Sequence, residues 1–442
     1  MKISLSDHFN TKKLILFALP SILMMIFISI YGVVDGFFIS NFAGEIDFAA
    51  VNFIFPFIQV LGSFGFLFGT GGGALVAKTL GEKENKKANQ IFSSIVYIVI
   101  GLAFVIASIG FIFMKDIAIW LGSSNDMLAS CVTYGRILMF SLPFLLLQFT
   151  FQSFLVVAEK PQVGLIVTLI AGITNMILDA LFIAVFKMGV TGAALATGIS
   201  QVIGGIIPLI YFIINRKNSI KVGSPKINLK EMFKICTNGS SEFVTQISMS
   251  IVGMLYNFQL MKYLGKSGVS AYGTFMYVSF MFVAMFIGYS VGVAPIIGFN
   301  YGAQNNKELK NVFRVSMKVV IIASVIMVLT AELLATPFSK IFVGYNKDLL
   351  EITKNAMRIS SFCFLFSGLG IFISSFFTAL NDGITSAIVS FLRTLVFQAA
   401  SILLLPLIFD VNGIWLSVVI ADLLAAVFGV LFLIIKKKKY NY

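Results

Sequence analysis

The sequence predicts an all-α polytopic membrane protein: twelve transmembrane helices arranged as two six-helix parallel repeats, an N-lobe and a C-lobe, around a central cavity. Three observations lead to this fold class. The 442 residues are 58% hydrophobic and only 12% charged, whereas soluble domains are roughly 45–50% apolar and about 25% charged. Twelve apolar runs of membrane-spanning length follow one another along the chain. The two halves of the sequence also match each other at a fixed offset.

The apolar runs define the expected helices in chain order. Polar breaks rich in Gly, Pro and Asn separate them, and each run is long enough to cross the ~30 Å hydrocarbon layer. They span about residues 14–40, 48–77, 91–114, 130–158, 162–186, 190–214, 235–261, 270–299, 312–335, 353–379, 385–409 and 412–435. The first run is longer than the ~7–15 apolar residues of a signal peptide, so we expect it to remain as the first membrane helix.

The placement of the basic residues predicts the orientation. An even number of helices puts both termini on one side, and 22 of the 32 Lys and Arg residues fall on that side. Nine fall on the other side, and Arg393 lies inside a helix. By the positive-inside rule, we expect both termini in the cytoplasm. The net charge of +13 therefore indicates topology and contact with anionic lipid headgroups, not nucleic-acid binding.

An internal duplication divides the chain at its polar midpoint. At a shift of half the chain length, the loop GEKENKKANQIF that begins at Gly81 falls on GAQNNKELKNVF, which begins at Gly302; the same shift pairs Gly44 with Gly265. Six helices return the chain to its starting side, so the halves are expected to be parallel repeats about an axis along the membrane normal. We expect an N-lobe at residues 1–215, a cytoplasmic linker at 216–234 and a C-lobe at 235–442.

Two acids lie within the expected helices of the first half. Asp35 interrupts the apolar stretch SIYGVVDGFFIS, although a charge at mid-membrane costs at least ~2.5–3.5 kcal/mol. A helical rise of ~1.5 Å per residue places Asp35 roughly 8 Å, and Asp179 roughly 10 Å, from the outer ends of their helices. Gly32 and Gly36 are expected to let a neighbouring helix approach Asp35 closely. The shared depth predicts that the two acids act together.

Three further polar residues reach a similar depth. Thr197 lies at the level of Asp179, Tyr134 slightly nearer the outer surface, and Asn175 one helical turn from Asp179 on the same face. We expect Asp35, Asn175, Asp179, Thr197 and Tyr134 to form a cation-coupling site. Carboxylate, amide and hydroxyl oxygens suit Na⁺, with Tyr134 outside that ligand set, and they also suit a carboxylate that holds a proton.

The second half lacks these acids. The half-length shift that relates the repeats places Tyr256 opposite Asp35 and Ala400 opposite Asp179, so the sequence predicts ion coupling in the first half alone. Asp422 and Glu332 are expected to be helix-end residues that reach water. The glycine run between Gly69 and Ala74 lacks the Gly-Lys-Ser/Thr of a phosphate-binding loop and is expected to permit close helix contact.

The sequence contains few of the residue patterns that enzymatic catalysis requires. Cys131, Cys236 and Cys363 are scattered, without a Cys-x-x-Cys pair, and the only histidine is His8 in the polar N-terminal segment. This composition argues against a Cys/His metal site and a histidine-based catalytic centre. We expect no enzymatic activity and no cofactor.

A family resemblance is carried by the twelve apolar runs, the two repeats and the stretches ALPSILMMIFISIYGVVDGFFISNFAG and NMILDALFI. The chain resembles the bacterial multidrug and toxic compound extrusion (MATE) transporters over essentially its whole length. The resemblance implies an antiporter of the bacterial inner (cytoplasmic) membrane that exports amphipathic, often cationic organic compounds in exchange for H⁺ or Na⁺. It also implies that the protein works as a monomer.

The resemblance extends to the site residues. Family members with an N-lobe cation site have Asn and Asp four apart in the fifth helix, as Asn175 and Asp179 are here, with a Thr matching Thr197 and a Tyr matching Tyr134. Span ten lacks the acid that some members use for a C-lobe Na⁺ site, which favours the branch with N-lobe coupling.

Five other polar residues are expected to line the substrate cavity, namely Tyr31, Asn52, Gln148, Gln152 and Asn257. The alternative function is a lipid-linked precursor flippase of the same superfamily. Its cavity should display several inward Arg or Lys residues for anionic headgroups, whereas only Arg136 and Arg393 are candidates here.

Overall fold

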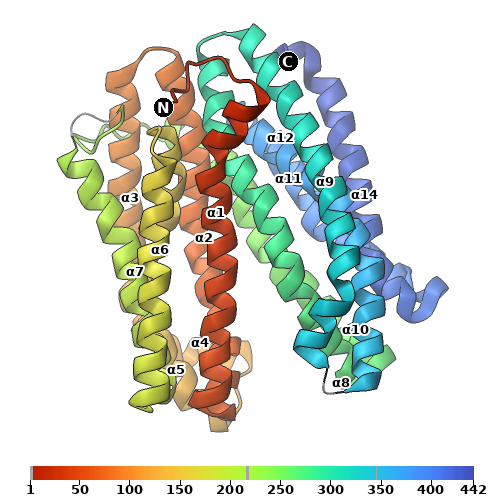
Figure 1. The fold of residues 1–442 in the computed structure, drawn as a ribbon. Coiled ribbons are helices and arrows are strands. Elements are labelled where there is room, and N and C mark those ends of the chain that lie inside the picture. Colours follow the sequence, from red (N-terminus) through yellow and green to blue (C-terminus); the bar gives the residue numbers. More distant parts are fainter. Residues whose placement is uncertain (1–2, 216–218, 345) are drawn as a thin grey trace.

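The computed structural model describes residues 3–215, 219–344 and 346–442, which form helices joined by short connections. Positions 216–218 of the expected linker lie outside the described residues. Figure 1 shows two helix bundles side by side, with the N- and C-termini at the same end of the molecule. We call α1–α7 the first bundle and α8–α14 the second bundle. The predicted all-helical polytopic fold is confirmed.

The first bundle holds seven α-helices and two π-helical stretches. They are α1 (Thr11–Phe38), η1 (Ile39–Ala43), α2 (Glu45–Gly81), α3 (Asn85–Ile112), α4 (Met114–Leu121), α5 (Asn125–Val157), α6 (Pro161–Asp179), η2 (Ala180–Val185) and α7 (Gly189–Ile214). η1 and η2 continue α1 and α6, and each lies close after an acid of the expected coupling site.

The second bundle has the same arrangement with more interruptions. Its elements are α8 (Leu229–Gly302), α9 (Asn306–Val343), α10 (Lys347–Ser360), η3 (Ser361–Cys363), α11 (Phe364–Ala379), α12 (Gly383–Phe391), η4 (Leu392–Val396), α13 (Phe397–Leu404) and α14 (Pro406–Tyr440). Gly265, with φ 61° and ψ −149°, divides α8 into two arms. Gly44, its partner in the duplication, likewise has a positive φ of 96° and separates η1 from α2.

Eleven helical segments of the described chain are long and apolar enough to cross a membrane. The first arm of α8, residues 229–264, falls outside this group because it carries charged and amide side chains such as Glu242, Gln246 and Lys262. Its polar face borders the central cavity described below. With this arm, the helices correspond one by one to the twelve apolar runs of the sequence.

The bundles touch through glycines in the half of the molecule that carries the termini. A Cβ on Gly81 would lie 2.1 Å from the Phe299 carbonyl oxygen, and one on Gly302 would lie 2.0 Å from the Lys78 carbonyl oxygen. These two contacts are equivalent, because the half-length shift converts Lys78 into Phe299 and Gly81 into Gly302. The interface therefore keeps the pseudo-two-fold symmetry that the duplication predicts.

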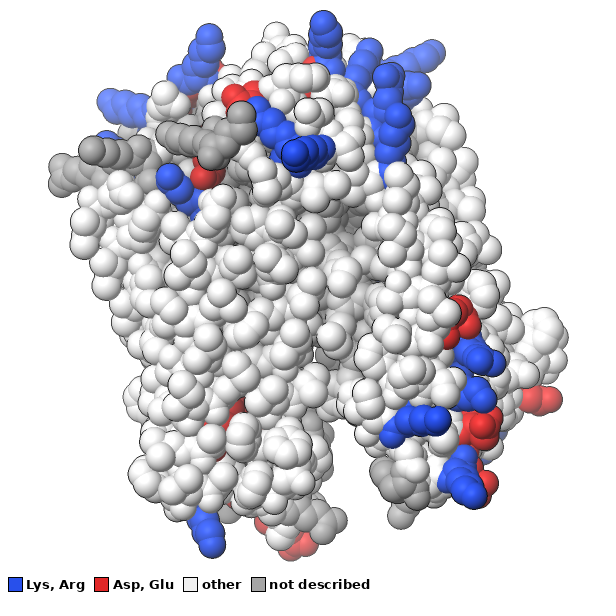
Figure 2. Space-filling view, in the orientation of Figure 1, with Lys and Arg blue, Asp and Glu red and all other residues white. Residues whose placement is uncertain are grey.

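A second symmetric pair of contacts follows along the same helices. A Cβ on Gly71 would lie 2.2 Å from the Ile235 carbonyl oxygen, and Gly239 meets the backbone of α2. In the other repeat, Gly292 meets Ala18, and the duplication pairs these residues with Gly71 and Gly239. The close helix contact predicted for the glycine run of α2 is confirmed. These backbone contacts seal the space between the bundles towards the termini. At the opposite end, Figure 2 shows a gap between the bundles.

The N-terminal segment, residues 3–10, joins the two bundles at the sealed end. Glu159, just after α5, accepts hydrogen bonds from the Ser4 hydroxyl (2.6 Å) and the Leu5 amide (2.8 Å). Glu308 in α9 accepts from the Phe9 amide at 2.9 Å. The side chains of Leu5 and Phe9 are buried within the core of the second bundle. This segment therefore acts as a strap across the interface.

We expect Glu308→Ala to weaken this strap. The buried Phe9 amide would lose its acceptor, which costs roughly 1–3 kcal/mol, and His8 would lose the carboxylate oxygen that lies 2.7 Å from its Nδ1. The thermal unfolding midpoint of the detergent-solubilised protein should fall, and residues 3–10 should become sensitive to proteolysis. Glu351→Gln is the matched control, because Glu351 forms only an exposed pair with Lys354. An unchanged midpoint and protease pattern in Glu308→Ala would contradict the role of the strap.

The C-terminal end is anchored within the second bundle. Asp382, in the connection between α11 and α12, accepts a hydrogen bond from the Tyr440 hydroxyl (2.7 Å) and lies 3.4 Å from the Lys436 ammonium. Burial acts to raise the pKa of Asp382, but the hydrogen bonds from Tyr440 and Thr385 and the charge of Lys436 outweigh it, so the pKa lies below its usual value. Asp382 therefore stays ionised and holds the basic tail.

Candidate functional site

A cavity of about 570 Å³ lies between the two bundles. The first bundle contributes side chains of α1, α2 and α5, and the second contributes both arms of α8 with α11, η4, α13 and α14. Much of the lining is aromatic or thioether, including Phe55, Phe66, Phe149, Phe280, Met249 and Met276. Large apolar walls with a few polar groups suit an amphipathic organic molecule.

All charged side chains that line this cavity, among the described residues, come from the second bundle. They are Glu242 of α8, Arg393 of η4 and Asp422 of α14. Asp422 was expected at a helix end in water, and that prediction is wrong. It lies near the middle of the long α14, is 5% exposed, and accepts a hydrogen bond from the Ser367 hydroxyl. The sequence placed Arg393 inside an expected helix and Asp422 at a helix end, and it held no signal that these two residues share a cavity with Glu242.

The five residues of the expected coupling site come together inside the first bundle. Asp35 (α1) and Asp179 (α6) are neighbours, and the charge of each carboxyl group acts on the other. The Tyr134 hydroxyl (α5) lies near both acids and beside Thr197 (α7). Asn175 lies one turn before Asp179 on α6, and Tyr134, Asn175 and Asp179 are at most 2% exposed. Four helices therefore meet around one buried polar cluster.

This cluster is short of hydrogen bonds. Buried polar atoms without a hydrogen-bonding partner in the described chain occur on all five residues: Asp35 Oδ1, Tyr134 Oη, Asn175 Nδ2, Asp179 Oδ1 and Oδ2, and Thr197 Oγ1. Unsatisfied groups of this kind are costly and call for an ion, a proton or water. Two carboxylates, an amide and a hydroxyl also form a hard oxygen donor set that fits Na⁺. The geometry thus fits either a cation or a shared proton.

The backbone is π-helical next to both acids of this cluster. Asp179 is the last residue of α6 before the π-helical η2, and η1 begins four residues after Asp35. Single-turn π-helical segments are rare and often occur at functional sites. The expected close helix contact at Gly32 and Gly36 is wrong, because a Cβ on either residue would have nothing within 4 Å. The space beside this face of α1 is open.

The residues expected in the substrate cavity lie in different environments. Gln152 lines the cavity. Gln148 is buried between α5 and α7, where its amide packs on Gly204. Tyr31 lies near Asp35 and faces α6. Asn52 and Asn257 are exposed and lie outside the lining of this cavity.

Two symmetric bundles, a cavity between them that is sealed at one end, and a buried carboxylate pair within the first bundle define a secondary transporter of the alternating-access type. The MatE family model matches this chain twice, at residues 20–181 and 243–403. The protein therefore belongs to the MatE family of transporters, and it is a transporter and not an enzyme.

Relatives and solved structures agree with this assignment. Multidrug export protein MepA of Staphylococcus aureus (strain MSSA476) is 27% identical over 425 residues, which cover 95% of this chain and 92% of the relative. The MepA protein of Staphylococcus haemolyticus (strain JCSC1435) is 28% identical over 423 residues, covering 94% and 90%. A crystal structure of MATE in complex with MaL6 matches with a TM-score of 0.93 at 20% identity over 98% of both chains. An outward-facing multidrug resistance MATE transporter matches with a TM-score of 0.92 at 19% identity, covering 98% of this chain and 97% of that one.

Proposed function

We propose that the protein is a cation-coupled antiporter that exports amphipathic, often cationic organic compounds by alternating access. Its relatives are multidrug export proteins, and its cavity combines aromatic walls with two carboxylates. The observation that carries the proposal is the buried cluster around Asp35 and Asp179, whose polar atoms lack partners within the described chain. Such a cluster responds to the binding and release of a cation.

Coupling takes place in the N-lobe. The cation, H⁺ or Na⁺, binds at Asp35 and Asp179, with Asn175 and Thr197 as further ligands in the case of Na⁺ and Tyr134 beside them. Binding neutralises two carboxylates that face each other in a dry environment, and this favours one packing of α1 and α6 over the other. The protein thereby belongs to the branch of the family with an N-lobe cation site.

The transporter sits in the bacterial inner membrane with both termini in the cytoplasm and functions as a monomer. This orientation rests on the 22 basic residues assigned to the terminal side. The N-lobe comprises residues 1–215, the linker 216–234 and the C-lobe 235–442. In this orientation the sealed end of the cavity faces the cytoplasm and the gap faces outward. A lipid-linked precursor is a poor fit, because the cavity has two acids against one arginine.

Reconstituted protein distinguishes the two coupling ions. Proteoliposomes loaded with a fluorescent organic cation are given a pure pH gradient in one series and a pure Na⁺ gradient in the other. Export above passive leak under one gradient names the ion and supports the antiporter. Export under neither gradient, by protein that still binds the dye in detergent, would overturn cation-coupled transport.

A further inference from the structure

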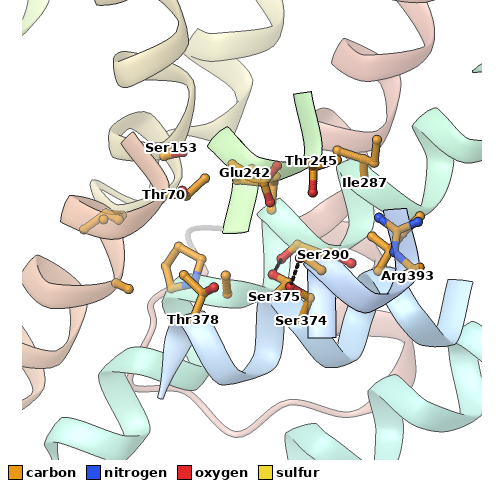
Figure 3. A pocket seen from close by; sticks show the side chains of 18 residues that line it. Thr70, Ser153, Glu242, Thr245, Ile287, Ser290, Ser374, Ser375, Thr378 and Arg393 are labelled. Atoms are coloured by element: carbon orange, nitrogen blue, oxygen red, sulfur yellow. Dashed lines mark hydrogen bonds between the residues drawn. The ribbon is translucent and has the colours of Figure 1, made fainter. Parts of the chain in front are cut away.

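Among the described residues, the charged side chains that line the central cavity all lie on the wall formed by the second bundle. Glu242, Arg393 and Asp422 come from three helical elements of the second bundle, whereas the described lining of the first bundle is uncharged. Glu242 and Arg393 also border a smaller, hydroxyl-rich pocket that continues from the cavity. Figure 3 shows both side chains directed into this pocket, with Thr245 between them. A ligand in the cavity therefore meets negative and positive charge on the same wall.

Arg393 is not paired with either acid. The guanidinium forms no ion pair within 4.0 Å and no hydrogen bond with any described residue, and its Nε is buried without a partner. Glu242 and Asp422 act on Arg393 only through space. A guanidinium has five N–H donors in a planar fork that matches a carboxylate. Those donors remain available to a bound molecule.

The backbone holds Arg393 in this place. It lies in the π-helical η4, a type of segment that is frequent at functional sites. Its aliphatic stem lies over Gly370 of α11, where a Cβ would come within 2.6 Å of the Arg393 Cδ. The missing side chain at Gly370 thus leaves room for the stem, and the stem directs the charged group towards the cavity.

We propose that Arg393 is a specificity-determining residue that binds a carboxylate of the substrate, while Glu242 and Asp422 attract its ammonium group. Arg393 is then the group that holds the carboxylate of an amphoteric compound, in which an aromatic framework carries both a basic amine and a carboxylate. This inference rests on the proposed export function and assigns a residue to substrate selection within it. Arg393 repels a simple organic cation, whereas for an amphoteric compound it supplies a charge-assisted hydrogen bond.

Two dyes that differ in one group test the proposal. One is a cationic xanthene dye with a free carboxylate, and the other is the methyl ester of that dye. Their affinities are measured by fluorescence on the purified protein. In Arg393→Gln, the affinity for the acid should fall about tenfold, as expected for loss of a charged hydrogen bond. The affinity for the ester should stay the same or rise, because a repulsive charge has been removed.

The opposite directions separate recognition from structural damage, which would weaken binding of both dyes. Arg136→Gln is the matched control, because the Arg136 guanidinium lies over the Phe111 ring, outside the cavity lining. Gly370→Val keeps the arginine but displaces its stem, so it should also lower the affinity for the acid relative to the ester. Gly370→Val therefore tests the role of Arg393 even if the Arg393→Gln protein does not fold.

A change of less than about twofold in the acid-to-ester affinity ratio, in a folded Arg393→Gln or Gly370→Val protein, would overturn the role of Arg393. If the role of Arg393 is overturned but wild-type proteoliposomes still export the ester, the proposed antiport function is retained. If wild-type proteoliposomes export neither dye under either gradient, the proposed function itself fails.

Discussion

Asp35→Asn and Asp179→Asn should each reduce gradient-driven export to the rate of passive leak. The amide keeps the shape of the carboxyl group but cannot take up a proton and is a weaker ligand for Na⁺. In each variant, the remaining carboxylate loses the second carboxylate with which it binds the coupling ion. Because neither acid lines the central cavity, the purified variants should still bind a fluorescent organic cation with wild-type affinity. Export is measured in proteoliposomes under the pH and Na⁺ gradients separately.

Asp47→Asn is the matched control for these variants. Asp47 is an acid of the same bundle, but its two oxygens already accept hydrogen bonds from the Ser130 hydroxyl (2.7 Å) and the Val190 amide (2.8 Å). It joins α2 to α5 and α7, and its asparagine variant should retain coupled export. Wild-type export by either Asp35→Asn or Asp179→Asn would remove that residue from the coupling site.

Gly239→Val should prevent the two bundles from sealing at the terminal end. A Cβ on Gly239 would overlap the Leu67 carbonyl oxygen, an atom of the α2 backbone that cannot move aside alone. Overpacking costs typically ~1–3 kcal/mol, and its upper end shifts a two-state equilibrium about 100-fold. We expect the bundles to separate at this end and coupled export to be lost, because one of the two alternating states becomes inaccessible.

Spin labels at the exposed Lys86 and Lys310 report this change, since they stand on α3 and α9 near the sealed end. The distance between the labels should increase in Gly239→Val. Gly101→Ala is the control, because a Cβ on Gly101 has nothing within 4 Å and α3 should accept it. An unchanged label distance together with normal export in Gly239→Val would show that the close glycine contact is not required.

Several features of this protein could be predicted from local properties of the chain. Apolar runs specify membrane helices because the bilayer thickness sets their length. The repeat at half the chain length predicted two equivalent halves, and the paired contacts of Gly81 and Gly302 agree with it. The depth of Asp35 and Asp179 follows from helical rise alone, so their convergence with Tyr134, Asn175 and Thr197 was predictable.

Other features depend on how each helix is rotated about its axis. Helix rotation is poorly encoded in this sequence, because lipid and protein interiors are equally apolar and periodicity does not separate them. For this reason Gly32 and Gly36 face open space instead of a neighbouring helix. Asn52 and Asn257 are likewise exposed, although they were expected to line the cavity.

By itself, the sequence determined the membrane class, the number and order of the helices, the duplication and the buried acid pair of the first bundle. Each of these follows from hydropathy, length or a fixed rise per residue along one chain. Only the tertiary structure decided that Glu242, Arg393 and Asp422 share one cavity wall. These residues lie on helical elements far apart in sequence, and only the packing and rotation of those elements direct their side chains into the same space.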